Sequence, residues 1–173
     1  MKRSGLIVAA LATAALAGCQ SMSADGPLLA SAGLEPTKGS KAIGEVSFEQ
    51  VGGKVRVVAQ VIRLPANGEF GFHIHEKGDC SSGDGMSAGG HFNPYGKPHG
   101  QGGERHAGDL PNLKSDAKGK AKLSVELDIV TLKPGPANIV GRAVIVHAQP
   151  DDYRTQPTGN AGARLACGVI KAI

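Results

Sequence analysis

The chain has 173 residues, enough for one domain and a short leader, and it is rich in glycine (26 residues) and poor in aromatic residues (3%). Its formal net charge of +4 falls to about +2 without Lys2 and Arg3 of the leader, which leaves 17 basic and 15 acidic residues. Nucleic-acid-binding proteins usually carry a strong basic patch or stripe. A charge this small, with no basic run, argues against nucleic acid as a partner.

The first 18 residues have the pattern of a secretory signal peptide. A basic head at Lys2 and Arg3 precedes the apolar run 6–17, which is too short for an ordinary membrane span. The run ends in Leu-Ala-Gly-Cys, which resembles the bacterial lipobox and makes Cys19 the expected acylated N-terminus. We therefore expect a periplasmic protein anchored by its lipid to the cell envelope, at the outer membrane. An ordinary signal peptide is the alternative.

Residues 19–40 are rich in Ser, Ala, Gly and Pro and show no clear periodicity. Segments of this composition form flexible linkers. We therefore expect a lipidated tether over 19–40 and a folded domain over 41–173.

From residue 41 onward, apolar and polar residues alternate as they do in β-strands. The segments with this pattern, or with short apolar runs, are 46–48, 54–63, 70–75, 123–129, 143–147 and 165–170. No segment of the mature chain shows a helical apolar stripe. Several short strands separated by turn residues indicate an all-β sandwich or barrel.

The segment 80–112 is long, polar and glycine-rich, which is typical of a functional or a disordered loop. It begins at Cys80. If Cys19 carries lipid, Cys80 and Cys167 remain as a pair in an oxidising compartment, where disulfides persist. On the chain-entropy model a bridge closing so long a loop would stabilise the fold by about 4 kcal/mol. Two free buried thiols are the alternative.

All six histidines fall into one pattern of metal-ligand spacing. In a strand, residues i and i+2 point to the same face, so His73 and His75 project together while Phe72 and Ile74 face the core. His147 ends another apolar run and adds a third imidazole borne by a strand. Imidazole-rich sites suit copper(II).

The loop carries a second set of ligand-type residues. Within 19 residues it offers three imidazoles and one carboxylate: His91, His99, His106 and Asp109. This set suits a closed, tetrahedral zinc site. Ordinary polar loop surface is the other reading of these four residues.

Taken together, these residues resemble the copper/zinc superoxide dismutases of the bacterial secreted type. The matching segments are FGFHIHEKGDC, GGHFNPYGKPHG, GERHAGDLPNL, GRAVIVHAQPDD and GNAGARLACGVI. The resemblance implies a Greek-key β-sandwich, a flattened barrel of immunoglobulin-like architecture with long metal-binding and electrostatic loops. It also implies dismutation of superoxide to oxygen and hydrogen peroxide. The family includes monomers and homodimers, so a homodimer is possible.

The resemblance also implies a role for each site residue. The copper ligands would be His73, His75, His91 and His147. The zinc ligands would be His91, His99, His106 and Asp109, with the imidazolate of His91 bridging both ions. Asp151 would link His73 to His99. Arg164 would attract and orient superoxide, helped by a Cys80–Cys167 bridge, and His91 would deliver a proton to the forming peroxide.

The sequence departs from many relatives at two places. The spacing between His99 and His106 is about two residues tighter, which predicts a more compact zinc loop. Beside Thr158, Pro157 stands where many relatives have a guiding lysine, which predicts weaker electrostatic steering.

Three other functions fit parts of the pattern. A periplasmic protein that binds copper and zinc without turnover would need neither Arg164 nor Asp151. A zinc hydratase with an HxH motif leaves the loop ligands unexplained. A blue-copper electron carrier needs a His-Cys-Met ligand run, which is missing.

Overall fold

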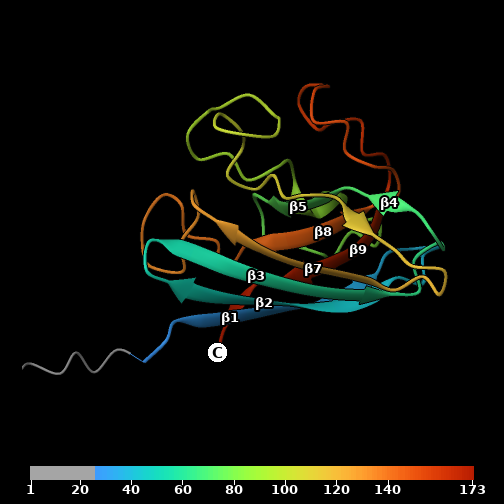
Figure 1. Ribbon diagram of the computed structural model, residues 1–173, viewed down its shortest axis with the longest axis horizontal. Helices are drawn as coiled ribbons and strands as arrows, with labels where there is room; N and C mark the ends of the chain where they lie inside the picture. The colour runs from blue at the N-terminus through green and yellow to red at the C-terminus, as the bar shows by residue number, and fades with distance from the viewer. Residues whose placement is uncertain (1–25) are drawn as a thin grey trace, which may run out of the picture.

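The computed structural model describes residues 26–173 (Figure 1), so the expected signal peptide, Cys19 and the first part of the expected tether lie outside the described residues. The strands are β1 (Leu29–Pro36), β2 (Ile43–Val51), β3 (Lys54–Ile62), β4 (Glu69–Phe70), β5 (Phe72–His75), β6 (Leu113–Lys114), β7 (Ala121–Leu127), β8 (Ala143–His147), β9 (Arg164–Val169) and β10 (Lys171–Ala172). One 3-10 turn, η1 (Met86–Ala88), is the only helical element in this part of the chain. Residues 26–173 contain no helix that is long and apolar enough to cross a membrane.

The strands form a curled antiparallel sheet in the order β5-β8-β9-β1-β2-β3-β7, with β10 beside β1 and a separate β4-β6 pair. Strand β1 joins the two halves, because residues 29–34 pair with β2 while Glu35 and Pro36 pair with β9. Figure 1 shows β2 and β3 on one side and β5 and β8 on the other. This arrangement confirms the expected Greek-key β-sandwich.

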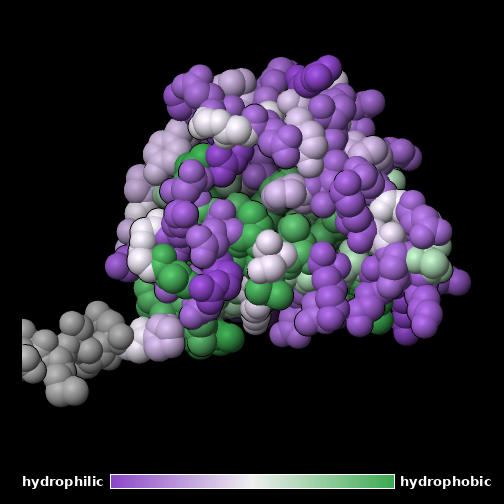
Figure 2. Space-filling view, in the orientation of Figure 1, coloured by the Kyte–Doolittle hydropathy of each residue, from purple (hydrophilic) through white to green (hydrophobic). Residues whose placement is uncertain are grey.

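The main core lies between the two halves. Its largest fully buried side chains include Phe48, Phe72 and Ile74. A smaller apolar cluster, containing Ile145 and Cys167, lies on the opposite face of the β5-β8-β9 layer. Figure 2 shows apolar side chains in the middle of one face of the molecule, framed by hydrophilic ones. The layer that carries His73 and His75 is thus supported by packed side chains on both faces.

The prediction of a tether over residues 19–40 is wrong for its later part. Residues 29–36 form β1, and Ala30, Ala32 and Leu34 are fully buried in the core. Their alternation with Ser31 and Gly33 is a strand pattern of period two. Most residues in this pattern are small, so the buried and exposed positions differ little in hydropathy. The composition of the segment therefore looks like that of a linker.

A pair of matched leucine substitutions tests this corrected boundary. Leu34→Ala should lower the free energy of unfolding by about 2–5 kcal/mol, because it leaves a cavity in a packed core. Leu28→Ala removes the same atoms from a side chain that is 40% exposed, so it should cost no more than about 0.5 kcal/mol. Chemical denaturation followed by circular dichroism measures both. Equal, small losses would mean that residues 28–36 are a tether after all.

Candidate metal centre

Strand β5 presents His73 and His75 on one face. It pairs with β8 so that His73 lies opposite Ile145 and His75 opposite Ala143. On the other face, Phe72 and Ile74 pack into the main core, as the alternation predicts. The two imidazoles are therefore held on a rigid strand that is anchored from behind.

His147 reaches the same place from the end of β8. The register between β8 and β9 shifts between Val146 and His147. A bulge of this kind redirects the side chain that follows it. The Nε2 atoms of His147 and His75 lie 3.3 Å apart.

The long loop returns along the free edge of β5. The Ile74 amide donates to the Gly108 carbonyl (2.9 Å), and the Phe92 amide donates to the Ile74 carbonyl (2.8 Å). A Cβ at Gly108 would lie 2.2 Å from the Ile74 carbonyl oxygen, so only glycine permits this approach. The pairing sets His91 opposite His75 and sets Asp109 opposite His73.

Two clusters of potential ligands result, and they share one residue. The ligand atoms within each cluster lie within 4.8 Å of one another. One cluster comprises His73, His75, His91 and His147, and the other comprises His91, His99, His106 and Asp109. All seven residues are buried. The structure therefore brings together each of the two ligand sets expected from the sequence.

Hydrogen bonds fix which ring nitrogen can serve as a ligand. His75 Nδ1 donates to the Gly89 carbonyl (2.9 Å), and His147 Nδ1 donates to the Gly162 carbonyl (3.2 Å). A carbonyl only accepts, so Nε2 of each ring keeps its lone pair. Both of these lone pairs belong to the first cluster.

Asp151 joins the two clusters. Its carboxylate oxygens lie 2.7 Å from His73 Nε2 and 2.9 Å from His99 Nε2. Both rings therefore have their Nδ1 left for a metal. A carboxylate behind a ligating imidazole fixes the tautomer and the orientation of the ring.

In the second cluster, the Asp109 carboxylate lies against the imidazoles. Oδ1 lies 2.8 Å from His91 Nδ1 and 3.4 Å from His106 Nδ1, and Oδ2 lies 3.0 Å from His99 Nδ1. The backbone amides of Gly100 and His106 also donate to Oδ2. One carboxylate and three Nδ1 atoms thus converge, which is the donor set of a tetrahedral zinc site.

Three buried ring nitrogens make no hydrogen bond: His73 Nδ1, His91 Nε2 and His99 Nδ1, whose 3.0 Å contact with Asp109 Oδ2 lacks hydrogen-bond geometry. Buried polar atoms are almost always satisfied, so each of these needs an explanation. All three belong to the two clusters. His91 in particular turns Nδ1 toward Asp109 and leaves Nε2 for the first cluster. The residues fit two ions that share His91.

Electrostatics favour neutral imidazoles here. Burial lowers the pKa of His75 well below its usual value, that of His91 to about 4 and that of His147 to about 3, with neighbouring histidines adding to the effect. Burial alone would raise the pKa of Asp109, but hydrogen bonds from His106 and His91 hold it far below its usual value. Metals bind neutral imidazole and carboxylate, so at neutral pH His75, His147 and Asp109 need lose no proton, whereas His91 would lose its one N–H proton to bind metal through both nitrogens.

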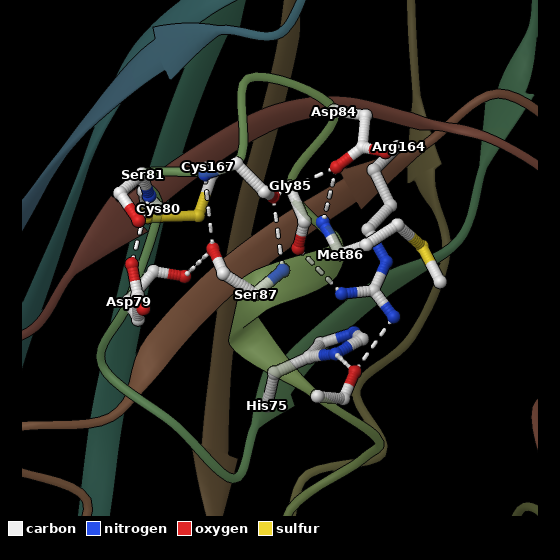
Figure 3. Close-up of a disulfide and its surroundings, with 12 residues drawn as sticks. His75, Asp79, Cys80, Ser81, Asp84, Gly85, Met86, Ser87, Arg164 and Cys167 are labelled. Atoms are coloured by element: carbon white, nitrogen blue, oxygen red, sulfur yellow. Dashed lines mark hydrogen bonds between the residues drawn. A yellow bond between two sulfur atoms is a disulfide. The ribbon is translucent and has the colours of Figure 1, made fainter.

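Arg164, at the start of β9, lines a cavity of about 220 Å³ together with His75, Met86 and His147. Its Nη1 donates to the Gly85 carbonyl and its Nη2 to the Gly89 carbonyl, both at 2.6 Å. The Gly89 carbonyl also accepts from His75 (Figure 3). Arg164 and the candidate copper ligand His75 are thus held by the same backbone carbonyl.

The loop that supplies these carbonyls is tied down by the predicted disulfide. Cys80 and Cys167 are joined, with their Cα atoms 5.8 Å apart. Figure 3 shows the bridge on one side of the Gly85 turn and Arg164 on the other. Strand β9 contains both Cys167 and Arg164, so the bridge fixes the loop relative to the arginine.

Two positioning residues escaped the sequence analysis. The side-chain amide of Gln156 accepts from the His99 amide and donates to the His99 carbonyl, both at 2.8 Å. Asn112 makes a similar pair of bonds with the backbone of Asp151. Both are single polar residues in loops, and no periodic pattern distinguishes them from polar residues that only face solvent.

Several known proteins resemble this chain over most of its length. A family model described as copper/zinc superoxide dismutase (SODC) matches residues 42–170. Superoxide dismutase (Cu-Zn) 2 of Aquifex aeolicus is 44% identical over 150 residues, which cover 83% of this chain and 87% of the relative. The Schizosaccharomyces pombe superoxide dismutase (Cu-Zn) is 45% identical, over 76% of this chain and 90% of its own. The crystal structure of a SOD-like protein from Bacillus subtilis, 39% identical, matches with a TM-score of 0.74 over 80% of this chain and 96% of that chain. This chain therefore belongs to the copper/zinc superoxide dismutase family.

Proposed function

We propose that the protein dismutes superoxide at a copper ion that is bridged through His91 to a structural zinc. Copper would be held by Nδ1 of His73 and by Nε2 of His75, His91 and His147. Zinc would be held by Nδ1 of His91, His99 and His106 and by Asp109. The observation that carries the proposal is that His91 belongs to both clusters, with Nδ1 against Asp109 and Nε2 buried without a hydrogen-bond partner.

The protein's own groups supply attraction, orientation and a proton. Copper, when bound, supplies a one-electron couple by which one superoxide is oxidised to oxygen and a second, with two protons, is reduced to hydrogen peroxide. The guanidinium of Arg164 offers the anion a fixed positive charge, and carbonyls occupy only two of its five N–H groups. His91 Nε2 is buried and has no hydrogen-bond partner, so whenever it is not bound to copper it can hold a proton and give it to the forming peroxide.

Metal exchange tests both the reaction and the shared ligand. The purified protein should bind one copper and one zinc, and dismutation should vanish when a chelator removes the copper. If cobalt(II) replaces zinc, the copper(II) EPR signal should weaken, because two paramagnetic ions that share an imidazolate couple magnetically. An unchanged EPR signal would rule out the bridge. No turnover at full copper occupancy would instead favour a protein that only binds metals.

Charge removal at Arg164 tests its assigned role. Arg164→Ala should lower kcat/KM about tenfold or more at low ionic strength and should flatten its dependence on salt, because the attracting charge is lost. Arg164→Lys keeps the charge and should keep most of the salt dependence. Lys171→Ala on β10 changes net charge equally but lies outside the cavity lining, and it serves as the control. Equal salt dependence in wild type and Arg164→Ala would contradict the role, provided that copper content is unchanged.

We propose further that Cys19 carries a lipid and holds the protein in the periplasm, at the outer membrane. The lipobox-like ending supports this location, and so does the Cys80–Cys167 disulfide, because such bonds persist in oxidising compartments. Labelled palmitate should enter the wild-type protein and not the Cys19→Ser variant. The wild type should also sediment with outer-membrane vesicles. Equal labelling of both proteins, or release of the wild type with the soluble fraction, would refute the anchor.

A further inference from the structure

The cavity in front of the candidate copper ligands has a methionine at its mouth. Met86 lines this cavity together with His75, His147 and Arg164, and it is 60% exposed. It is the only methionine among residues 26–173. An exposed apolar side chain gains little from the hydrophobic effect, so packing does not explain its place.

The position of Met86 is set by ordered backbone. It is the first residue of η1, where its amide donates to Asp84 Oδ1 (2.9 Å) and its carbonyl accepts from the Gly89 amide (3.0 Å). The Cys80–Cys167 disulfide ties the same loop to β9. Figure 3 shows the thioether beside the guanidinium of Arg164. The Met86 side chain thus extends from ordered backbone at the cavity rim and is largely exposed to solvent.

The inner part of this cavity offers two prepared nitrogen donors. His75 and His147 each donate through Nδ1 to a backbone carbonyl, which leaves the two Nε2 lone pairs 3.3 Å apart. The charged side chain in the lining is Arg164. Its positive charge suits an entering anion and opposes an entering cation, and the Asp84 carboxylate beside it offsets this charge only in part. A ligand that does not depend on charge would therefore help copper to enter.

We propose that Met86 captures copper(I) at this mouth and passes it to His75 and His147 while the protein is being loaded. A thioether is a soft ligand that selects copper(I), whereas copper(II) and zinc prefer imidazole or oxygen ligands. The transfer is a ligand exchange, in which a copper–sulfur bond breaks as copper–nitrogen bonds form, and no electron moves. The inference rests on the copper site proposed above.

The test compares the loading of copper(I) with that of copper(II). Copper-free, zinc-loaded protein is mixed anaerobically with the copper(I)–bicinchoninate complex, and the loss of its colour gives the transfer rate. In a second arm, copper(II) sulfate is added and the growth of the copper(II) EPR signal of the site gives the rate. Met86→Leu keeps the volume and apolar character of the side chain, and Met86→Gln keeps its length and adds polarity. Neither has a soft donor.

Both variants should take up copper(I) about tenfold more slowly than wild type, because both lack the soft ligand. Their copper(II) rates should stay within about twofold of wild type, because imidazoles bind that ion unaided. Equal slowing in both arms, slowing in only one variant, or no slowing would each overturn the capture role. The proposed copper site is tested separately by the wild-type protein in the copper(II) arm. If its EPR signal shows no nitrogen ligands, the copper site itself is wrong.

Discussion

The backbone hydrogen bonds along the free edge of β5 decide where the candidate ligands lie. Strand β5 ends the strand order, so its outer edge has unpaired backbone groups, and the loop satisfies them at Ile74. Side chains alternate between the two faces of a sheet. A slip of one residue in this pairing would therefore move His91 and Asp109 to the opposite face, away from His73 and His75. Gly108 protects the register, because a side chain there would collide with the Ile74 carbonyl. Backbone hydrogen bonds that take no part in metal binding therefore position candidate ligands of both clusters.

The two sites are mechanically coupled because one side chain belongs to both clusters and a second side chain bonds to one ring of each. His91 contributes one nitrogen to each cluster, and Asp151 holds one ring of each. Asp151 is held in turn by Asn112, which joins the two long loops. These loops rise on the same side of the molecule, beyond β5 (Figure 1). Moving one ring would therefore disturb the other site, so an ion in the zinc set restrains the geometry of the copper set.

The sequence predicted those parts of the structure that depend on repeated patterns or on ligand chemistry. Strands such as β2, β3 and β8 show clear alternation or apolar runs, and the six histidines have the spacing of metal ligands. Strand β1 was missed because alanine and glycine give little hydropathy contrast. Gln156 and Asn112 were missed because a side chain that binds a distant backbone leaves no local pattern. Met86 was overlooked because its relation to the cavity depends on how the loop folds.

The cavity meets two opposite requirements with different kinds of bonding. On every turnover it has to admit an anion, and a fixed cationic group such as Arg164 serves this by long-range Coulomb attraction. Copper has to enter only once, as a cation, against that same charge. A neutral thioether such as that of Met86 attracts copper(I) by short-range soft-ligand bonding, which leaves the field of the cavity unchanged. Asp84 already places one carboxylate beside Arg164, where it accepts from the Met86 amide. A further carboxylate would attract copper more strongly, but its charge would repel superoxide on every turnover. A neutral soft donor is therefore the type of ligand that permits loading without slowing the reaction.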